Sequence, residues 1–270
     1  MTLDPRRREL WHAMGLGAVW EAPVARARGA VDSAAPSTPP LAPVAAAQAE
    51  QAGAPAARPI AAPAALSGDA RRAAIARMEW DDLQQAVAAC TACGLCRSRR
   101  QTVFGVGHAQ AHWLLVGEAP GAEEDARGEP FVGQAGKLLD NMLAAVGLAR
   151  SGGDPAESVY IANVLKCRPP GNRNPEPPEV AQCEPFLQRQ IALLQPRLVV
   201  VMGRFAAQSL LGTDASIASL RGRVHAIDVD GRSVPVIVTY HPAYLLRNLA
   251  DKAKSWSDLC LARQVAQRSA

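Results

Sequence analysis

Residues 113–121 read WLLVGEAPG, a short apolar run closed by a turn with a glycine at each end. Such a run is typical of a strand buried inside a parallel sheet. The chain contains three more runs of this form, at residues 159–162, 198–202 and 234–239. Helical patterns occur between and after these runs, at residues 134–146, 176–194, 204–211 and 252–267. The alternation predicts an α/β fold, a three-layer sandwich with a central four-stranded, mostly parallel sheet.

The first part of the chain has a different composition. Residues 30–65 are mostly Ala and Pro without an aromatic residue, so they cannot bury enough apolar surface to offset their chain entropy. We expect a docking peptide at residues 1–28, a disordered linker at 29–78 and a compact domain at 79–270. The sequence has no run of eighteen apolar residues and no signal-peptide core, which predicts a cytoplasmic protein without a membrane span. The net charge of +4 is mild, so any basic surface for nucleic acid must be local.

The N-terminal peptide combines basic and apolar residues. Residues 6–16 read RRRELWHAMGL, in which Leu10, Trp11 and Met14 form a short amphipathic turn beside a basic cluster. This peptide resembles the N-terminal peptide of the psi subunit of the bacterial clamp loader, which implies a partner in the replication machinery. Packing of the peptide on its own domain is the alternative. We expect the protein to be a monomer.

The chain has six cysteines but no export signal, which favours metal or cluster ligation over disulfides. Four thiolates are the number needed for a [4Fe-4S] cluster or a structural zinc ion. Cys90 and Cys93 form a pair with two residues between them, and Cys96 follows Cys93 at the same spacing, so it could replace one member of that pair. The alternative for all of these cysteines is that they are small buried side chains. Cys260 falls on apolar positions of the last helix, so we assign it to the core. The four best-placed candidates are Cys90, Cys93, Cys167 and Cys183.

Four motifs follow one another in the compact domain: GEAPG at 117–121, GEPFVG at 128–133, NVLKCRPP at 163–170 and HPAYLLR at 241–247. In this order they resemble the family 4 uracil-DNA glycosylases, from about Cys90 to the final helix. The resemblance implies the α/β fold of the uracil-DNA glycosylase superfamily. It implies hydrolysis of the N-glycosidic bond of uracil in single- or double-stranded DNA, the first step of base excision repair. It also implies a [4Fe-4S] cluster on the four cysteines named above.

The motifs stand at the carboxyl ends of the predicted strands, where α/β sheets bind ligands. The resemblance makes Phe131 the surface on which a flipped uracil stacks and His241 the donor to uracil O2. The side-chain amide of Asn163 can accept from N3–H and donate to O4, a pattern that cytosine inverts. The backbone around the base is expected to come from Gly117, Ala119, Pro120 and Gly121.

Two residues, Glu118 and Glu124, are candidates for the carboxylate that acts on water. Asp125, at the same helix start, is expected to be only a solvated cap. Tyr244, Leu245 and Arg247 are expected to meet DNA, with an apolar wedge entering the duplex and the arginine binding phosphate.

Arg168, Arg173 and Lys166 are expected to add contacts to the DNA backbone. One related group bonds covalently to DNA through a histidine, but residues 167–174 contain none, so we expect no covalent trapping. Two competing hypotheses are a glycosylase with broader targets and a non-catalytic iron-sulfur module that binds DNA. The catalytic hypothesis requires the rings of Phe131 and His241 to lie together in an open pocket.

Overall fold

The structure, a computed structural model, describes residues 68–268. The predicted docking peptide and most of the predicted linker lie outside these residues. Helix α2 (Gly68–Ile75) packs against α6 (Pro177–Leu194), and Ile75 is fully buried in that contact region. Residues 68–78, which we expected to be linker, are therefore part of the folded unit.

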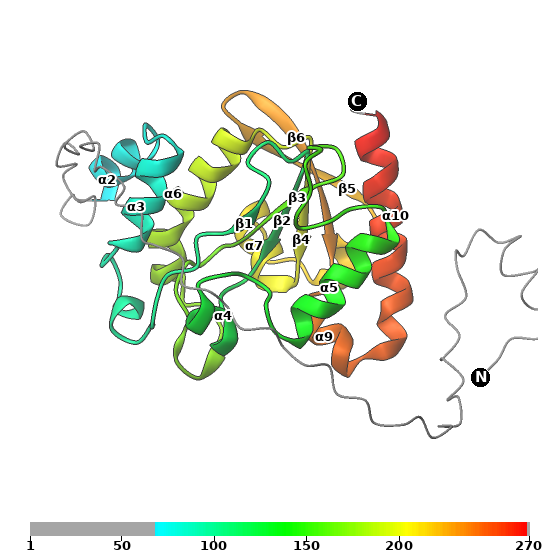
Figure 1. The fold of residues 1–270 in the computed structure, drawn as a ribbon, viewed down its shortest axis with the longest axis horizontal. Helices are drawn as coiled ribbons and strands as arrows, with labels where there is room; N and C mark the ends of the chain where they lie inside the picture. The colour runs from blue at the N-terminus through cyan, green and yellow to red at the C-terminus, as the bar shows by residue number, and fades with distance from the viewer. Residues whose placement is uncertain (1–67, 269–270) are drawn as a thin grey trace, which may run out of the picture. The chain divides into compact units, whose positions relative to one another are not determined.

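A single six-stranded sheet forms the centre of the fold (Figure 1). In spatial order its strands are β1 (Val106–Gly107), β3 (Val159–Asn163), β2 (Trp113–Gly117), β4 (Leu198–Met202), β6 (Arg232–Thr239) and β5 (Val224–Val229). The four central strands are parallel, as predicted, whereas the two edge strands are antiparallel to their neighbours. The predicted count of four strands was wrong.

The two missed strands differ from the buried ones. β1 has only two residues, too few to produce a pattern. β5 alternates between exposed and half-buried positions, and a tight turn at Asp230 and Gly231, both with positive φ, joins it to β6. An Asp-Gly pair between alternating residues is a strong hairpin signal, so β5 was detectable from the sequence.

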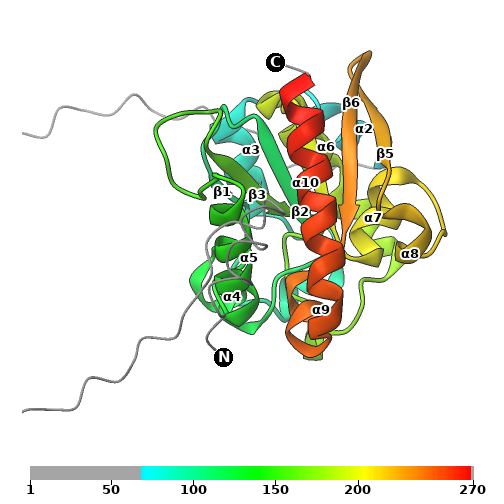
Figure 2. The same ribbon diagram turned by 90° about the vertical axis from the view of Figure 1, so that its right-hand side faces the viewer.

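Helices cover both faces of the sheet, which confirms the layered α/β architecture (Figures 1 and 2). On one face, Leu114 and Val116 of β2 join a core with α6 and α7 (Arg204–Leu211). On the other face, Trp113 and Leu115 join a core with α5 (Gln134–Ala145) and α10 (Lys252–Arg268). These four helices begin and end within about two residues of the predicted positions.

Shorter elements connect these layers. They are α3 (Trp80–Ala88), η2 (Gly94–Arg97), α4 (Ala122–Arg127), η3 (Pro170–Asn172), α8 (Ile217–Leu220), α9 (Pro242–Arg247) and η4 (Leu249–Asp251). Between residues 68 and 268, no helix is both long and apolar enough to cross a lipid bilayer. The register of the parallel strands brings their carboxyl ends to one edge, where Gly117 pairs with Asn163 and Met202 with Thr239.

Candidate active site

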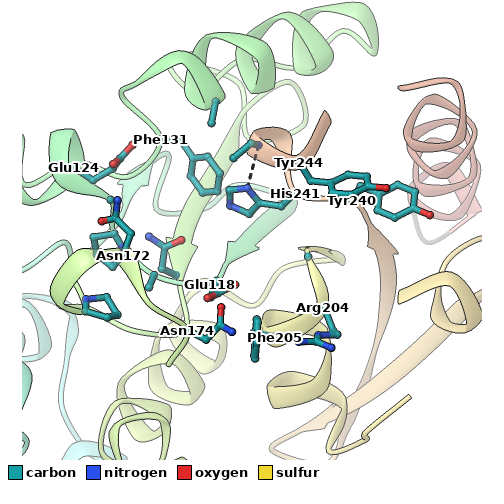
Figure 3. Close-up of a pocket in the computed structure, with 18 of the residues that line it drawn as sticks. Glu118, Glu124, Phe131, Asn172, Asn174, Arg204, Phe205, Tyr240, His241 and Tyr244 are labelled. Atoms are coloured by element: carbon teal, nitrogen blue, oxygen red, sulfur yellow. Dashed lines mark hydrogen bonds between the residues drawn. The ribbon is translucent and has the colours of Figure 1, made fainter. Parts of the chain in front are cut away.

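A pocket of about 710 Å³ lies at this edge of the sheet (Figure 3). Most of the residues predicted for the site line it: Glu118, Ala119, Pro120, Gly121, Glu124, Phe131, Asn163, His241, Tyr244 and Arg247. The pocket also contains residues that the sequence analysis did not assign to it, among them Asn172, Asn174, Arg204 and Phe205. Arg204 and Phe205 begin the helix after β4, so the rule that placed the other residues at strand ends would have found them as well.

Gly117 leaves a narrow space at the end of β2. A Cβ atom at this position would overlap both Oδ1 of Asn163 and the ring of Phe131, so these two groups meet where a side chain is missing. Asn163 is buried, and its Oδ1 accepts no hydrogen bond from any described residue. A buried acceptor without a partner costs about 1 to 3 kcal/mol. Such an atom in a pocket wall is suited to accept from a bound ligand.

The rings of Phe131 and His241 lie together, as the catalytic hypothesis requires. Their centroids are 5.3 Å apart and their planes differ by 27°, which is a stacked arrangement. Figure 3 shows the two rings side by side in the pocket, Phe131 from the loop before α5 and His241 from the end of β6. The ring of Phe131 therefore lies close to both His241 and Asn163 in the pocket.

Hydrogen bonding determines which nitrogen of His241 carries the proton. Nδ1 accepts from the backbone N–H of Ala243 at 3.1 Å, so the proton of the neutral ring is on Nε2. Loss of hydration lowers the pKa of His241 to about 4; the nearby Glu124 opposes this shift and Arg247 adds to it. His241 is therefore a neutral hydrogen-bond donor at neutral pH.

The two candidate glutamates have different surroundings. Glu124 accepts from the backbone N–H of Val132 at 3.1 Å and so holds the loop that carries Phe131. The carboxylate of Glu118 is half-buried and makes no hydrogen bond to any of residues 68–268. Burial raises the pKa of Glu118, and the nearby Arg204 partly offsets this rise.

Asp125 is not the solvated cap that we expected. It is buried and accepts from the backbone N–H of Arg100 at 2.9 and 3.1 Å. It therefore joins the start of α4 to the segment that follows the first cysteines. No local pattern indicates this contact, because the partner is 25 residues away.

The exposed leucine of helix α9 is not the one that we predicted. Leu245 is fully buried, so it cannot be the apolar wedge, and the exposed leucine is Leu246, at 42%. Tyr244 stacks on Tyr240 with ring centroids 4.9 Å apart and donates to Asp251 Oδ2 at 2.6 Å. The helix thus presents a fixed tyrosine and an exposed leucine next to the pocket.

Lys166 does not reach the surface, so the expected contact of its side chain with DNA is wrong. It is 1% exposed, and its Nζ donates to the carbonyl of Asn163 at 2.8 Å and to Oε1 of Gln190 at 2.6 Å. Burial lowers the pKa of Lys166 to about 7. Lys166 therefore supports the backbone of the residue whose side chain enters the pocket.

Two arginines of the loop after Cys167 already form hydrogen bonds within the protein, and one of them, Arg173, lines the pocket. Arg168 donates to Asn172 Oδ1 at 2.7 Å, and Arg173 donates to both carboxylate oxygens of Glu179 at 2.6 and 2.9 Å. These contacts fix the loop after Cys167. Both arginines remain half-exposed.

Four cysteines gather near the pocket in the folded chain. Cys167 and Cys183 are buried in one small cluster with Leu95 and Leu165, and Cys93 packs against it. Cys90 lies close enough to influence the ionisation of Cys93, Cys167 and Cys183. Within residues 68–268, no three His, Cys, Asp or Glu side chains are placed so as to hold a metal ion.

Two arginines point at these sulfur atoms. Arg99 Nη1 donates to Cys167 Sγ at 2.9 Å, and Arg71 Nη2 donates to Cys90 Sγ at 3.7 Å. Burial nevertheless raises the pKa of Cys167 to about 11 and that of Cys183 to about 12. These thiols ionise at neutral pH only if a positive centre binds them.

The remaining cysteines are separate cases. Cys96 lies near Cys93 and contributes to raising its pKa. Cys260 is not a core residue, as we had assigned it, because it is partly exposed and lines a shallow surface pocket on α10.

The pocket at the strand ends combines an aromatic ring, a neutral histidine donor and an amide oxygen that has no partner among residues 68–268, and apolar pockets with a few such polar groups bind small molecules. Comparison with known proteins identifies the family. The model of the uracil DNA glycosylase superfamily matches residues 104–260, and the chain belongs to this superfamily.

Among curated proteins, the chain is similar to several type-4 uracil-DNA glycosylases. It is 45% identical to that of Archaeoglobus fulgidus over 170 residues, which cover 62% of this chain and 82% of the relative. It is 43% identical to that of Thermotoga maritima over 173 residues, covering 64% of this chain and 85% of the relative. The resemblance to family 4 that the sequence motifs indicated is confirmed.

The low pKa of His241 predicts a specific pH dependence of stability. An unfolded histidine binds a proton below about pH 6.5, whereas folded His241 stays neutral down to about pH 4. The unfolded state is therefore favoured by protonation, and His241 makes the fold less stable as the pH falls through this window. Urea unfolding of the wild type and of His241→Asn between pH 7 and 4.5 measures the effect. The stability of the wild type relative to the variant should decrease with falling pH; a constant difference would contradict a neutral His241.

Proposed function

We propose that this chain hydrolyses the N-glycosidic bond of uracil in DNA and so begins base excision repair. The observation that carries the proposal is Oδ1 of Asn163, which has no hydrogen-bond partner among residues 68–268 and lies beside the Phe131 ring in an open pocket. The similarity to type-4 uracil-DNA glycosylases supports the same activity. Because the substrate is DNA, we propose the cytoplasm as the place of action.

The substrate base must leave the duplex stack to reach such a pocket. In the proposed complex it stacks on Phe131, and the side chain of Asn163 accepts from N3–H and donates to O4. Cytosine presents the opposite pattern, so its acceptor would meet the acceptor of Asn163 and its donor would meet the donor. The missing Cβ of Gly117 keeps this space free, and the backbone of residues 119–121 closes one side of it.

Breaking the bond between C1′ and N1 leaves the electron pair on uracil and positive charge on the sugar. We assign His241 the role of stabilising the uracil anion, since Nε2–H is a donor and the ring is neutral. A donor that is already oriented lowers the barrier because it need not reorganise during the reaction.

Water must add to C1′ and lose a proton. Of the two glutamates, Glu118 suits this task better, because its carboxylate has no hydrogen-bond partner in the described part of the chain and its pKa is raised toward neutrality. Glu124 is occupied by the N–H of Val132, so we assign it to positioning the Phe131 loop.

Contacts to the DNA strand are proposed for α9 and the loop after Cys167. Tyr244 and Arg247 line the pocket, and Leu246 replaces Leu245 as the apolar residue that enters the stack. We propose that Arg173, which lines the pocket, meets a phosphate. We propose that the protein acts as a monomer on single- or double-stranded DNA. We also propose a partner in the replication machinery for residues 1–28, which lie outside the described residues.

We also propose a [4Fe-4S] cluster on Cys90, Cys93, Cys167 and Cys183. The chemistry of the donor set suits such a group, because four thiols from three separate segments gather there and two arginines direct donors at the sulfurs. Within residues 68–268 no three of these side chains already have metal-binding geometry, so the thiols would have to move closer together when the cluster binds. A cluster would supply the positive charge that ionises these buried thiols and would join the segment before β2 to α6. None of the steps above depends on it.

A glycosylase assay on oligonucleotides tests the function. The wild type should release uracil but not hypoxanthine, and Asn163→Asp should release uracil about 10-fold more slowly or worse while accepting cytosine better. Asn141→Asp, an exposed change on α5, is the matched control and should behave as the wild type. Release of hypoxanthine would favour the broader glycosylase, and DNA binding without base release would favour a non-catalytic module.

The roles of the two glutamates can be separated by removing one charge at a time. Glu118→Gln should lower kcat about 100-fold while leaving binding of free uracil almost unchanged, because only the acceptor of the water proton is lost. Glu124→Gln should lower kcat much less, since an amide oxygen can still accept a hydrogen bond from the N–H of Val132. Single-turnover rates of the two variants test these roles. A larger decrease in rate for Glu124→Gln than for Glu118→Gln would assign the water proton to Glu124 instead.

The proposed cluster predicts a brown protein with about four iron atoms per chain. Cys167→Ser and Cys183→Ser should lose the visible absorption and the bound iron, because each removes one ligand. Cys260→Ser is the control and should keep both, since this residue lies on the surface of α10. Purified protein that contains zinc and no iron would contradict the proposal.

A further inference from the structure

The backbone of Phe131 adopts an unfavourable conformation. Its φ is +55°, in the left-handed region that residues with a side chain rarely occupy. The residue is nevertheless buried, and its ring lies against His241 in the pocket. Strain of this kind persists at functional sites only where surrounding contacts impose it.

The contacts that impose it come largely from one side chain. Arg150, which follows α5 in the chain, donates from Nη1 to the carbonyl of Pro130 at 2.8 Å and from Nη2 to the carbonyl of Phe131 at 2.9 Å. The guanidinium group is anchored on its other side by Asp140, whose Oδ1 accepts from Nε at 3.0 Å and from Nη2 at 2.9 Å. The side chain of Arg150 is only 15% exposed.

These hydrogen bonds act on both peptide planes that flank Phe131. The carbonyl of Pro130 belongs to the plane before the residue, and the carbonyl of Phe131 belongs to the plane after it. The second plane is also held at its other end, where the N–H of Val132 donates to Glu124. Since the orientation of the two planes sets φ and ψ, Arg150 and Glu124 together fix the backbone of Phe131.

Helix α5 is shaped to accept this arrangement. A Cβ atom on Gly136 would overlap the carbonyl oxygen of Phe131, so the first turn of the helix approaches that carbonyl as only glycine allows. The guanidinium group has a rigid planar fork that can reach two carbonyls at once, which a lysine ammonium cannot do in the same way.

We propose that Arg150 is a positioning residue for the ring of Phe131: it holds the strained backbone that keeps this ring in the base pocket. The inference rests on the proposed function, in which that ring stacks on the flipped uracil. Arg150 itself does not touch the base; without it, Phe131 relaxes to negative φ and its ring leaves the stacking position.

Enzyme kinetics provide the first test. Arg150→Met should raise KM for uracil-containing DNA and the inhibition constant of free uracil about 10-fold, the loss expected when one base–aromatic stack is removed, with a smaller change in kcat. Arg150→Lys should recover little of this loss. Asp140→Ala, an exposed change that removes the acceptor of Nε and Nη2, should shift the same constants in the same direction by a smaller factor. Arg127→Met, which affects an exposed pair on α4, is the control and should have no effect.

A double-mutant cycle separates positioning from a general structural role. In a Phe131→Ala background, Arg150→Met should cause no further loss, because there is no ring left to position. The same factor of loss in both backgrounds would overturn the proposal.

A readout that needs no activity distinguishes this proposal from the proposed function. The chain has four phenylalanines, so 4-fluorophenylalanine labelling gives four ¹⁹F signals, and Phe131→Leu assigns one of them. Arg150→Met should move or broaden that signal, because the ring leaves the face of His241. An unchanged Phe131 signal would overturn the positioning role, whereas a shifted signal in a protein inactive on uracil would retain it and reject only the proposed function.

Discussion

The parallel register of four neighbouring strands creates the site. β2 and β3 end level with each other, so Gly117 and Asn163 stand side by side, and β4 and β6 are level at Met202 and Thr239. The residue after β4, Gly203, has a φ of +93° and donates its N–H to the carbonyl of Thr239 at 2.9 Å, and a Cβ there would crowd the His241 side chain. Recognition groups from segments more than a hundred residues apart therefore share one edge without a long loop to hold them.

The segment that follows β3 contributes to both the pocket and the cysteine region. The side chain of Asn163 enters the pocket, its carbonyl accepts from Lys166, and Cys167 follows directly among the gathered thiols. Gln190 completes the link, because it accepts from Lys166 and donates to the carbonyl of Phe104 at 3.0 Å. A fully buried lysine needs such acceptors, since an unpaired ammonium would be far too costly in this position. The pocket and the cysteine region are thus parts of one hydrogen-bonded core.

The sequence predicted what depends on local pattern and missed what depends on distant partners. Buried parallel strands produce apolar runs, and the strand-end rule then located most of the pocket. The exposed leucine of α9 was misplaced by one position, because Leu245 and Leu246 are chemically equivalent and only packing decides which one faces inward. The burial of Asp125 and Lys166 was missed for a related reason: their partners are 25 and 24 residues away, and no periodicity records such contacts.

The charges of the pocket match the charges of the proposed reaction. Uracil leaves as an anion, and the donor next to it, His241, is neutral, so it can be buried at little cost and still polarise O2. The sugar becomes cationic, and the free carboxylate, Glu118, follows β2 and lies toward Arg204, away from the stacked rings (Figure 3). Burial raises the pKa of Glu118, and the nearby Arg204 partly offsets this rise, which supports the ionised form that can accept a proton from water. A single pocket can therefore stabilise opposite charges because they develop against different strand ends.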